Sequence, residues 1–353
     1  MRVLLLSRYG SLGASSRVRS LQYLPYFRAH GVTVEVTPLF SDAYLKGLYS
    51  GRSLWREVLA GYARRAYALA RARQFDLLIV EKELFPFLPA AAERLLHAMG
   101  RPYVADYDDA LFHRYDCHRL FLVRRFLGRK IDSVMQHASL VVAGNEYLAV
   151  RAWAAGANRV EVVPSVVDME RYRSWQVGSN EVPIVGWIGT PQTSFYLQPL
   201  LPVFEALQKE TSVRFVAVGA HESDFRGTLV EVWPWSEESE VAAILQFDIG
   251  IMPLKDSAWE QGKCGYKLLQ YMACGIPVVA SPVGVNRQIV THGENGFLAA
   301  TEGEWLKALK QLLEKGVVGR KALGTAGRER VEGWYSLDAQ APRLLAALKA
   351  AVR

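Results

Sequence analysis

The chain has 353 residues, half of them hydrophobic, and a formal net charge of +7. A chain of this length can form two domains, each with its own core, and its hydrophobic content excludes a disordered protein. No run of eighteen apolar residues occurs, and polar residues interrupt the apolar start VLLL without a cleavage site, so neither a membrane-spanning helix nor a signal peptide is expected.

The cysteines and the distribution of charge narrow the class further. Cys117, Cys264 and Cys274 form no metal-ligand pattern and are typical of a reducing compartment, so we expect a cytoplasmic protein. Residues 1–170 contain 23 Lys and Arg against 16 Asp and Glu, whereas residues 171–353 contain 19 of each. A basic half suits phospholipid headgroups, a lipid-linked diphosphate or nucleic acid, although ordinary solubilising charge has the same composition.

The first 39 residues predict a strand, a loop of glycine and serine, an amphipathic helix and a second strand. This is the opening of a doubly wound sheet. Gly13 and Ser16 lie where the strand meets the helix, where backbone can approach a ligand, and Arg17 follows at the helix start. A third glycine at the dinucleotide spacing is missing, so no nicotinamide cofactor is expected. A tight turn with surface arginines is the alternative.

Two later stretches combine arginine with large apolar residues. Residues 51–75 predict a long helix that fits either an anionic membrane surface or an ordinary domain helix. Residues 118–132 alternate basic and apolar residues and are the stronger candidate for contact with an anionic membrane, because each basic residue near such a surface contributes on the order of 1 kcal/mol. No recognised nucleic-acid motif occurs, so we expect no nucleic-acid partner.

A buried strand between these stretches ends in a cluster of acidic residues. Asp106, Asp108 and Asp109 follow its apolar core, at the carboxyl end where parallel sheets bind ligands. We expect three carboxylates this close to raise one another's pKa, which is typical of a functional site. We expect them to bind a ligand; a helix cap at Asp106 and a metal site are the alternatives.

The second half repeats the pattern of strand, loop and helix after a linker that we expect to end near Gly178. One strand delivers Gly189 and Thr190 to the front of a helix, and the next strand ends at Gly219. Glycines at these points let a ligand approach the backbone closely. The sequence therefore predicts a second Rossmann-like domain.

Residues 248–295 predict a buried strand, a loop, a helix and another buried strand. The loop and the helix start contain Lys263, Gly265 and Lys267. N–H groups at a helix start lack partners within the helix, and together with the helix dipole and two ammonium groups they suit a phosphate or diphosphate. Either lysine could instead be an ordinary solvated loop residue.

The segments YMACGIPVVAS and THGENGFL resemble the carboxy-terminal signature of retaining, nucleotide-sugar-dependent glycosyltransferases of family 4, whose fold is called GT-B. VEVVPSVVDMERY is similar to the interdomain segment of that family, and the resemblance covers nearly the whole chain. It implies an α/β fold of two Rossmann-like doubly wound domains facing across a cleft. Residues 1–172 would bind the acceptor, with a helix at about 338–353 packing back on them, and residues 173–337 would bind the donor.

The sequence departs from the family at two places. The family has two glutamates with seven residues between them, and Gly262 and Gln270 occupy the matching positions. Gln270 could still bind the nucleotide ribose, whereas Gly262 has no side chain to bind the donor sugar. The family also has an arginine and a lysine near the first helix of the second domain, and neither occurs between Ile188 and Lys209. Lys263 and Lys267 are the expected substitutes.

The resemblance assigns a role to each candidate residue. Asp108 falls closest to a family histidine that contacts the transferred sugar or the acceptor, and the nucleobase would lie against the loop at Trp235, for which buried core is the alternative. The candidates for the chemical step are Lys263, Lys267 and Asp108; for donor binding, Gly13, Gly189, Thr190, Gly219, Trp235, Gly265, Tyr266 and Gln270; for acceptor binding, Ser16, Arg17, Asp106 and Asp109. No metal or cofactor is implied beyond the UDP- or GDP-sugar co-substrate.

The implied reaction moves a sugar, with retention at the anomeric carbon, from the nucleotide to a glycan or lipid-linked acceptor. The expected setting is bacterial surface polysaccharide or lipopolysaccharide synthesis, in the cytoplasm or at the inner face of the membrane as a peripheral protein. Stabilising the departing diphosphate is the main catalytic task. Two other classes stay open: an epimerase or phosphorylase of the same fold, and a non-catalytic nucleotide-sugar-binding subunit, which the missing glutamates would fit.

Overall fold

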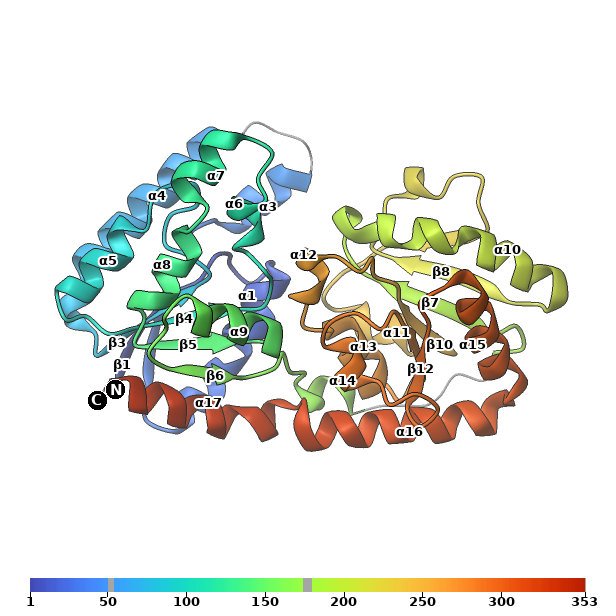
Figure 1. Cartoon of the computed structure of the whole chain (residues 1–353). Coiled ribbons are helices and arrows are strands. Elements are labelled where there is room, and N and C mark those ends of the chain that lie inside the picture. Colours follow the sequence, from blue (N-terminus) through green and yellow to red (C-terminus); the bar gives the residue numbers. More distant parts are fainter. Residues whose placement is uncertain (50–53, 174–179, 353) are drawn as a thin grey trace. The chain divides into compact units, whose positions relative to one another are not determined.

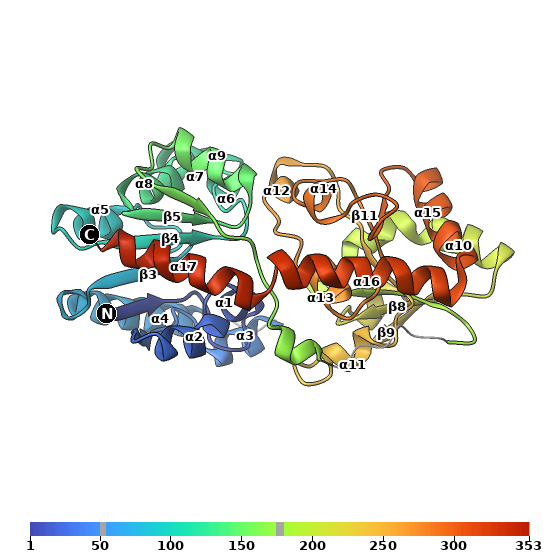
Figure 2. The same cartoon turned by 90° about the horizontal axis from the view of Figure 1, so that it is seen from below.

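The structure is a computed structural model that describes residues 1–49, 54–173 and 180–352, and it divides into two compact units (Figures 1 and 2). The first unit comprises Met1–Val166, Gln261–Cys264 and Gln340–Arg353, and the second comprises Val167–Glu260 and Gly265–Ala339. The last residues of the predicted linker, 174–178, lie outside the described residues. The acceptor and donor roles given to the two domains stay predictions.

The first unit is built on a six-stranded, fully parallel sheet in the order β2-β1-β3-β4-β5-β6. Its strands are β1 (Arg2–Leu6), β2 (Thr33–Val36), β3 (Leu77–Glu81), β4 (Tyr103–Tyr107), β5 (Leu140–Ala143) and β6 (Val160–Val162). The central strands consist of buried, mainly apolar residues because helices cover both faces of a parallel sheet.

Short helices and turns connect these strands. The α-helices are α1 (Ala14–Arg19), α2 (Leu24–Ala29), α3 (Asp42–Tyr49), α4 (Trp55–Ala70), α5 (Ala91–Ala98), α6 (His113–Asp116), α7 (Phe121–Leu127), α8 (Lys130–His137) and α9 (Glu146–Ala154), with 3-10 turns η1 (Leu21–Tyr23) and η2 (Ala72–Gln74). The predicted long helix in residues 51–75 is α4 followed by η2.

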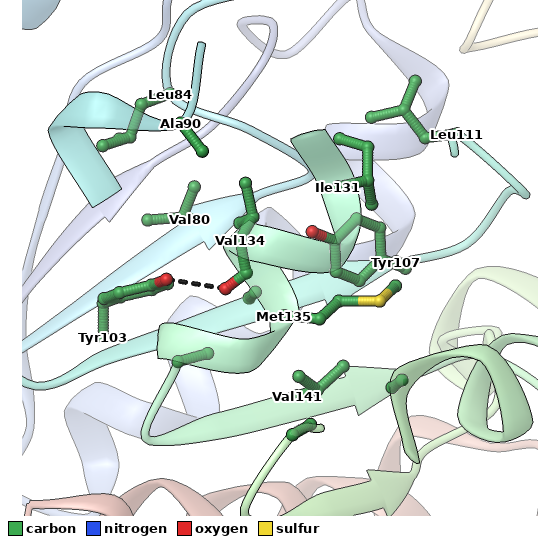
Figure 3. Packing of buried hydrophobic residues seen from close by; sticks show 14 of the residues in the cluster. Val80, Leu84, Ala90, Tyr103, Tyr107, Leu111, Ile131, Val134, Met135 and Val141 are labelled. Carbon is green, nitrogen blue, oxygen red and sulfur yellow. Dashed lines mark hydrogen bonds between the residues drawn. The ribbon is translucent and has the colours of Figure 1, made fainter. Parts of the chain in front are cut away.

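The core of the first unit lies between its sheet and the covering helices (Figure 3). Ile131, Val134 and Met135 of α8 pack against Val80 of β3 and Val141 of β5, and all five are buried. Tyr103 reaches the same helix, and its hydroxyl donates a hydrogen bond of 2.6 Å to the carbonyl oxygen of Val134. Partnering this buried hydroxyl avoids the cost of an unsatisfied polar group.

The chain's last helix, α17 (Leu337–Ala351), contributes to the first unit from Gln340 onward. Its Leu344 and Leu348 line a small apolar cavity with Leu5 and Ile79, which belong to β1 and β3. The end of the chain therefore covers one face of the first sheet, as Figure 2 shows.

The second unit has a sheet of the same kind, in the order β12-β11-β10-β7-β8-β9, again fully parallel. Its strands are β7 (Ile184–Ile188), β8 (Arg214–Val218), β9 (Val230–Trp233), β10 (Ile249–Met252), β11 (Val278–Ala280) and β12 (Gly296–Leu298).

Its helices are α10 (Leu201–Glu210), α11 (Glu240–Ile244), α12 (Ala258–Gln261), α13 (Tyr266–Ala273), α14 (Asn286–Ile289), α15 (Glu302–Glu314) and α16 (Gly316–Trp334), with 3-10 turns η3 (Met169–Tyr172), η4 (Pro191–Leu200) and η5 (Glu222–Asp224). Two apolar clusters fill the two faces of the sheet. The predicted fold class, α/β with two Rossmann-like doubly wound domains, is confirmed.

The strand orders locate where each sheet can bind a ligand. The order reverses between β1 and β3 in the first unit and between β7 and β10 in the second. At such a point the two connections leave toward opposite faces, so a crevice opens beyond the carboxyl ends of the strands. Among the described residues, no helix is long and apolar enough to cross a membrane.

Replacing Gly324 of α16 with Ala should destabilise the protein, because the new Cβ would lie 1.8 Å from the carbonyl oxygen of Gly275. We expect a loss of roughly 1–3 kcal/mol in the free energy of unfolding, measured by urea denaturation. Gly333→Ala is the matched control, since Gly333 lies in the same helix with no atom within 4 Å of a Cβ there. It should be neutral or stabilising, and equal losses in both variants would contradict the packing assigned to Gly324.

Candidate functional site

The first unit's switch point is formed by the loop after β1 and by the residues that follow β3. Gly13 ends the loop and precedes α1, and a Cβ there would lie 2.3 Å from the Cβ of Tyr9. Only glycine therefore fits this turn. The Gly13 N–H donates to the carbonyl oxygen of Gly10, which keeps the loop tight beside the sheet.

Ser16, a predicted acceptor residue, lies in the first turn of α1, directly after this loop, and is fully buried. Its hydroxyl donates a 2.7 Å hydrogen bond to Glu81, the last residue of β3, and accepts one of 3.0 Å from the N–H of Tyr9. Burial raises the pKa of Glu81. Ser16 thus joins the glycine loop to the end of β3. Arg17, beside it, donates to the carbonyl oxygen of Ser11 in the same loop.

Asp106, another predicted acceptor residue, forms an ion pair with a buried arginine. Arg19 of α1 donates to both carboxylate oxygens of Asp106, at 2.6 and 3.1 Å, and also to the carbonyl oxygen of Val163. Both side chains are buried. A bidentate pair of this kind holds α1 against β4 and β6, and it gives Asp106 a structural partner. Asp106 does not cap the next helix, α6, because the N-cap residue of that helix is Phe112.

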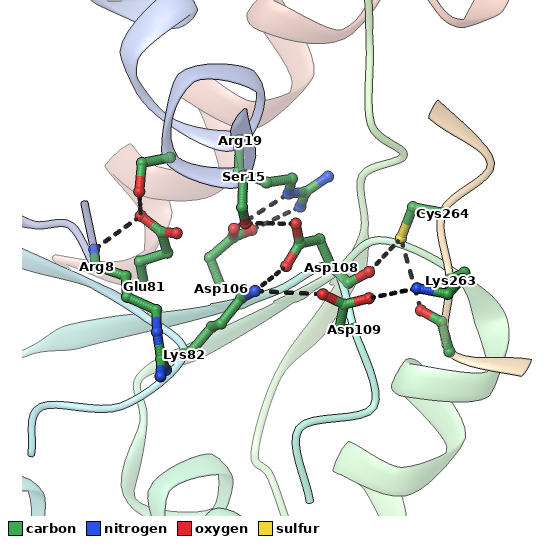
Figure 4. A network of polar contacts seen from close by, with 12 residues as sticks. Arg8, Ser15, Arg19, Glu81, Lys82, Asp106, Asp108, Asp109, Lys263 and Cys264 are labelled. Atoms are coloured by element: carbon green, nitrogen blue, oxygen red, sulfur yellow. Dashed lines mark hydrogen bonds and ion pairs between the residues drawn. The ribbon is translucent and has the colours of Figure 1, made fainter. Parts of the chain in front are cut away.

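Asp108 and Asp109 share a lysine that sequence reasoning missed (Figure 4). The ammonium of Lys82, the residue after β3, lies 2.9 Å from Asp108 Oδ1 and 3.4 Å from Asp109 Oδ2. Ser15 donates a 2.6 Å hydrogen bond to the other oxygen of Asp108. The carboxyl ends of β3 and β4 and the start of α1 therefore meet in one polar cluster.

The charge state of Asp108 differs from the one that the sequence predicts. Burial alone would raise the pKa of this carboxyl, but the Lys82 ammonium and the Ser15 hydroxyl outweigh it and lower the pKa to about 2. The expectation that the three aspartates raise one another's pKa is therefore wrong for Asp108. Asp106 does have a raised pKa, caused by its burial, even though Arg19 opposes the shift.

Residues 261–264 bring Lys263 and Cys264 into the first unit. Asn145, the N-cap of α9, donates from its side-chain amide to the carbonyl oxygen of Lys263 at 2.9 Å. The Cys264 thiol donates to the carbonyl oxygen of Asp108 at 3.2 Å, and the Lys263 ammonium lies 3.8 Å from Asp109. Figure 4 shows Lys263 and Cys264 together on one side of this aspartate pair, with Lys82 on the other.

Gly262 lies in the same segment, in close contact with backbone. A Cβ at this residue would lie 2.5 Å from the Cβ and 2.6 Å from the nitrogen of Ala110. No real side chain approaches so closely without moving its neighbour. The position that carries a glutamate in the resembled family is therefore closed to any side chain in this structure.

In the second unit, three predicted donor residues lie together at the ends of β7 and β8. Gly189 donates its N–H to the carbonyl oxygen of Val218, and a Cβ on Gly219 would lie 2.4 Å from the carbonyl oxygen of Gly189. Gly219 also has φ +80°, which favours glycine. Thr190 begins η4 and forms a capping box with Thr193.

Trp235 lies beside this pair of glycines. A Cβ on Gly219 would approach the Cβ of Trp235 to 3.1 Å, and the indole N–H donates to Glu240 at 3.1 Å. The other oxygen of Glu240, which is buried, accepts from Arg171 of η3. The indole is 37% exposed, so the buried-core alternative does not describe it.

Helix α13 begins at the β7 and β10 switch point. Its N-cap, Gly265, has φ +67°, and a Cβ there would lie 2.4 Å from the side chain of Ile289. The Lys267 ammonium lies over the ring of Trp187 in β7, 5.3 Å from its centroid. Lys267 is thus next to the strand that leads to Gly189.

Gln270 lies one turn further along α13 and is buried. Its side-chain amide donates to the hydroxyl of Tyr172 at 3.4 Å, and burial raises the pKa of that hydroxyl well above its usual value. Tyr266, the first residue of the helix, lies close enough to Tyr172 to contribute to that shift. The predicted donor residues of the second unit therefore gather around the carboxyl ends of β7 and β8 and the start of α13.

One further cluster has the composition of a metal site. The donor atoms of His113, Asp116 and Cys117 lie within 4.8 Å of one another. His113 Nε2 is 2.8 Å from the hydroxyl of Tyr147, and Asp116 pairs with Arg151 at 3.2 Å. Because Arg151 already neutralises Asp116, the cluster is balanced as a set of hydrogen bonds and ion pairs.

Sequence reasoning missed several residues of these sites, above all Lys82, Glu240 and Arg171. A lysine directly after a buried strand, in IVEK, and a glutamate five residues after a tryptophan carry only weak local signals. The partners of Lys82 are 26 and 27 residues away, and those of Arg171 are 66 and 69 residues away. Only the folded chain brings them together.

The fold is shared with known glycosyltransferases. A sucrose-phosphate synthase from Thermosynechococcus elongatus superposes with a TM-score of 0.71 at 14% identity, covering 99% of this chain and 98% of that one. A glycosyltransferase from Rickettsia africae gives a TM-score of 0.72 at 12% identity, covering 100% and 98%. HepE from Anabaena, in complex with UDP-glucose, gives 0.68 at 17% identity, covering 99% and 100%. The class that the fold defines is therefore GT-B.

A match in sequence points to one family within this class. Residues 182–315 match the family described as glycosyl transferases group 1. The predicted resemblance to group 1 glycosyltransferases is thus confirmed over this segment, and the GT-B fold extends over the whole chain. The O-antigen biosynthesis protein RfbC of Myxococcus xanthus is 30% identical over 127 residues, which are 32% of this chain and 10% of that protein. The match thus spans about a tenth of the length of that curated relative.

Replacing Asp108 with Asn should destabilise the protein at neutral pH and have little effect in acid. A folded-state pKa of about 2, below the usual 3.8, means that ionised Asp108 contributes stability above pH 4 that is lost as the pH falls toward 2. The difference corresponds to roughly 2 kcal/mol. Urea unfolding of both proteins at steps between pH 7 and pH 2 measures it, and a difference that does not shrink below pH 4 contradicts the assigned charge state.

Proposed function

We propose that this glycosyltransferase moves a sugar, with retention at the anomeric carbon, from a UDP-sugar to a glycan or lipid-linked acceptor. The carrying observation is the start of α13 in the second unit, where Gly265 opens the helix and Lys267 lies beside β7. A helix start directs its first N–H groups and the positive end of its dipole outward, and with an ammonium nearby these suit the diphosphate of a departing nucleotide.

The second unit would hold the donor. Gly189 and Gly219 carry no side chain of their own and lie at the carboxyl ends of β7 and β8, where a nucleotide would approach the backbone. Trp235 offers a partly exposed aromatic face beside these glycines, which suits a nucleobase. Gln270 and Tyr172, both with hydrogen-bonding groups, would contact the ribose from α13 and η3.

UDP is the nucleotide we favour. HepE, whose fold this chain shares, is known in complexes with UDP and with UDP-glucose. The sequence itself left uridine and guanosine open. No metal or organic cofactor is part of the proposal, because Lys267 and the N–H groups of α13 can supply the positive potential that the diphosphate requires.

The first unit would bind the acceptor. Asp108 and Asp109 present ionised or partly exposed carboxylates at the carboxyl ends of the strands, next to the glycine loop at Gly13. A carboxylate accepts hydrogen bonds from sugar hydroxyls and stabilises positive charge that develops at the anomeric carbon. Lys263 lies near Asp109, and it would add a cation on the acceptor side.

The biological role we propose is assembly of a bacterial surface polysaccharide on the cytoplasmic side of the membrane. RfbC, named for O-antigen biosynthesis, supports this role over the matched 127 residues. The excess of basic residues in the first half supports an acceptor anchored in an anionic membrane.

A surface on α7 supports membrane contact (Figure 1). Four large apolar side chains there are more than half exposed, with Phe126 at 73%: Leu120, Phe121, Leu122 and Phe126. Four exposed arginines surround them: Arg119, Arg124, Arg125 and Arg129. Exposed aromatic and aliphatic groups beside arginines suit the interface of an anionic bilayer, where the former enter the acyl region and the latter meet lipid phosphates.

The double variant F121S/F126S should weaken binding to vesicles that contain anionic phospholipid at least tenfold, measured by co-sedimentation at physiological salt. Val318→Ser in α16 is the matched control, since Val318 is an exposed apolar residue of the second unit, and it should bind as the wild type does. Equal binding of the double variant and the wild type would exclude α7 as the contact.

A transfer assay tests the proposed reaction. Purified protein with UDP-sugars and a lipid-linked or glycan acceptor should release UDP and form an α- or β-linked product that keeps the donor's anomeric configuration. Lys267→Ala should lower turnover at least tenfold, because a charge-assisted contact to the diphosphate is lost. Lys263→Ala should also lower it. Lys255→Ala is the control, since Lys255 is exposed on the loop after β10.

Three outcomes would contradict the proposal. Inversion of configuration would exclude the retaining mechanism. Interconversion of the sugar by the protein with donor alone would indicate an epimerase. Full turnover in Lys267→Ala would exclude the diphosphate contact at α13.

A further inference from the structure

Lys82 adopts a backbone conformation that lysine rarely adopts. Its φ is +68°, in the left-handed region, where the Cβ of a residue other than glycine is strained. Its N–H donates to the carbonyl oxygen of Asp106 at 2.9 Å, so the turn is fixed to β4. A glycine would adopt this turn without strain, and the lysine side chain therefore has a use that outweighs the cost.

The side chain of Lys82 connects two strands. From the end of β3 its ammonium reaches Asp108 and Asp109 after β4, at 2.9 and 3.4 Å. The lysine is 9% exposed, whereas the side chains of Asp108 and Asp109 are 14% and 30% exposed. The cation is thus enclosed, whereas Asp109 and, to a smaller extent, Asp108 are partly exposed; Figure 4 shows both carboxylates directed at the ammonium.

We propose that Lys82 is a positioning residue for the acceptor-binding carboxylates, fixing Asp108 and Asp109 at the carboxyl edge of the first sheet so that they present anions to substrate hydroxyls. The inference rests on the proposed function for the role of the two aspartates. Each carboxylate oxygen can accept more than one hydrogen bond, so the contacts to Lys82 and Ser15 leave room for a hydroxyl of the substrate.

The groups around Asp108 determine its charge. The cationic neighbours are Lys82 after β3, Arg19 in α1 and Lys263. Arg8 after β1 lies close to Lys82. The remaining neighbours are anionic or neutral: Glu81, Asp106, Asp109, Ser15 and Cys264. Burial alone would raise the pKa of Asp108, and Lys82, the closest cation, outweighs this effect together with the Ser15 hydroxyl and Arg19. Asp108 therefore acts as an anion that accepts hydrogen bonds, not as a proton donor.

A second buried lysine in the same unit shows what a purely structural ion pair looks like. Lys130 of α8 pairs with Glu83 and donates to the carbonyl oxygen of Phe85, and neither charged side chain is more than 1% exposed. That pair has no open side on which a ligand could bind. The partners of Lys82, by contrast, are partly open to solvent.

Lys82→Met tests the inference, with Lys130→Met as the matched control. In Lys82→Met, kcat of the transfer reaction should fall at least tenfold at pH 7. A new acid limb should also appear in the pH–rate profile, because the pKa of Asp108 rises by about 1–3 units when the positive charge of Lys82 is lost. Lys130→Met should lower stability without adding an acid limb. Lys82→Arg keeps the charge and should keep the acid limb out of the measured range.

The charge of Asp108 can also be measured without activity. Carbon-13 NMR of the aspartate carboxyls, assigned with Asp108→Asn, should give a higher pKa for Asp108 in Lys82→Met than in the wild type. An unchanged pKa, or an unchanged pH–rate profile in an active Lys82→Met enzyme, would overturn the inference. Absence of transfer by the wild type, with the pKa shift present, would instead count against the proposed function and support Lys82 as the residue that sets the charge.

Discussion

Each sheet of the protein depends on one constraint: its strands are all parallel, so every connection must return across a face of the sheet. Where the strand order reverses, between β1 and β3 and between β7 and β10, neighbouring connections depart to opposite faces. The residues at those carboxyl ends cannot cover one another. Small residues and charges gather there in both units, with Gly13 and Lys82 in the first and Gly189 and Lys267 in the second.

The two units place charge at the edges of their sheets in different ways. In the first, buried carboxylates are matched by buried cations, as in the pair of Arg19 and Asp106, because an unpaired buried charge would be costly. In the second, glycine backbone and one helix start take the place of charged side chains, and the ion pair of Arg171 and Glu240 serves to hold Trp235. The proposed transfer would use the carboxylates of the first unit for the acceptor and the electropositive helix start of the second for the donor.

Local signals were sufficient to predict much of this architecture. Apolar runs indicated the central strands, and glycines at strand ends indicated Gly189, Gly219 and Gly265, whose tight contacts the structure describes. The sequence could not indicate Lys82, since its role depends on pairing β3 with β4, nor could it reveal that Lys263 belongs to the first unit. The pKa of Asp108 was predicted in the wrong direction for the same reason: the nearest charges in sequence were counted, and the nearest in space was not.

The close packing of Gly262 on Ala110 has a consequence for how this chain can vary. A glutamate at this position would displace the backbone of Ala110, so a side chain there requires a simultaneous rearrangement of residues 261–264. A single-codon change at Gly262 is therefore disfavoured in this packing, and residue 262 can diversify only together with its neighbours.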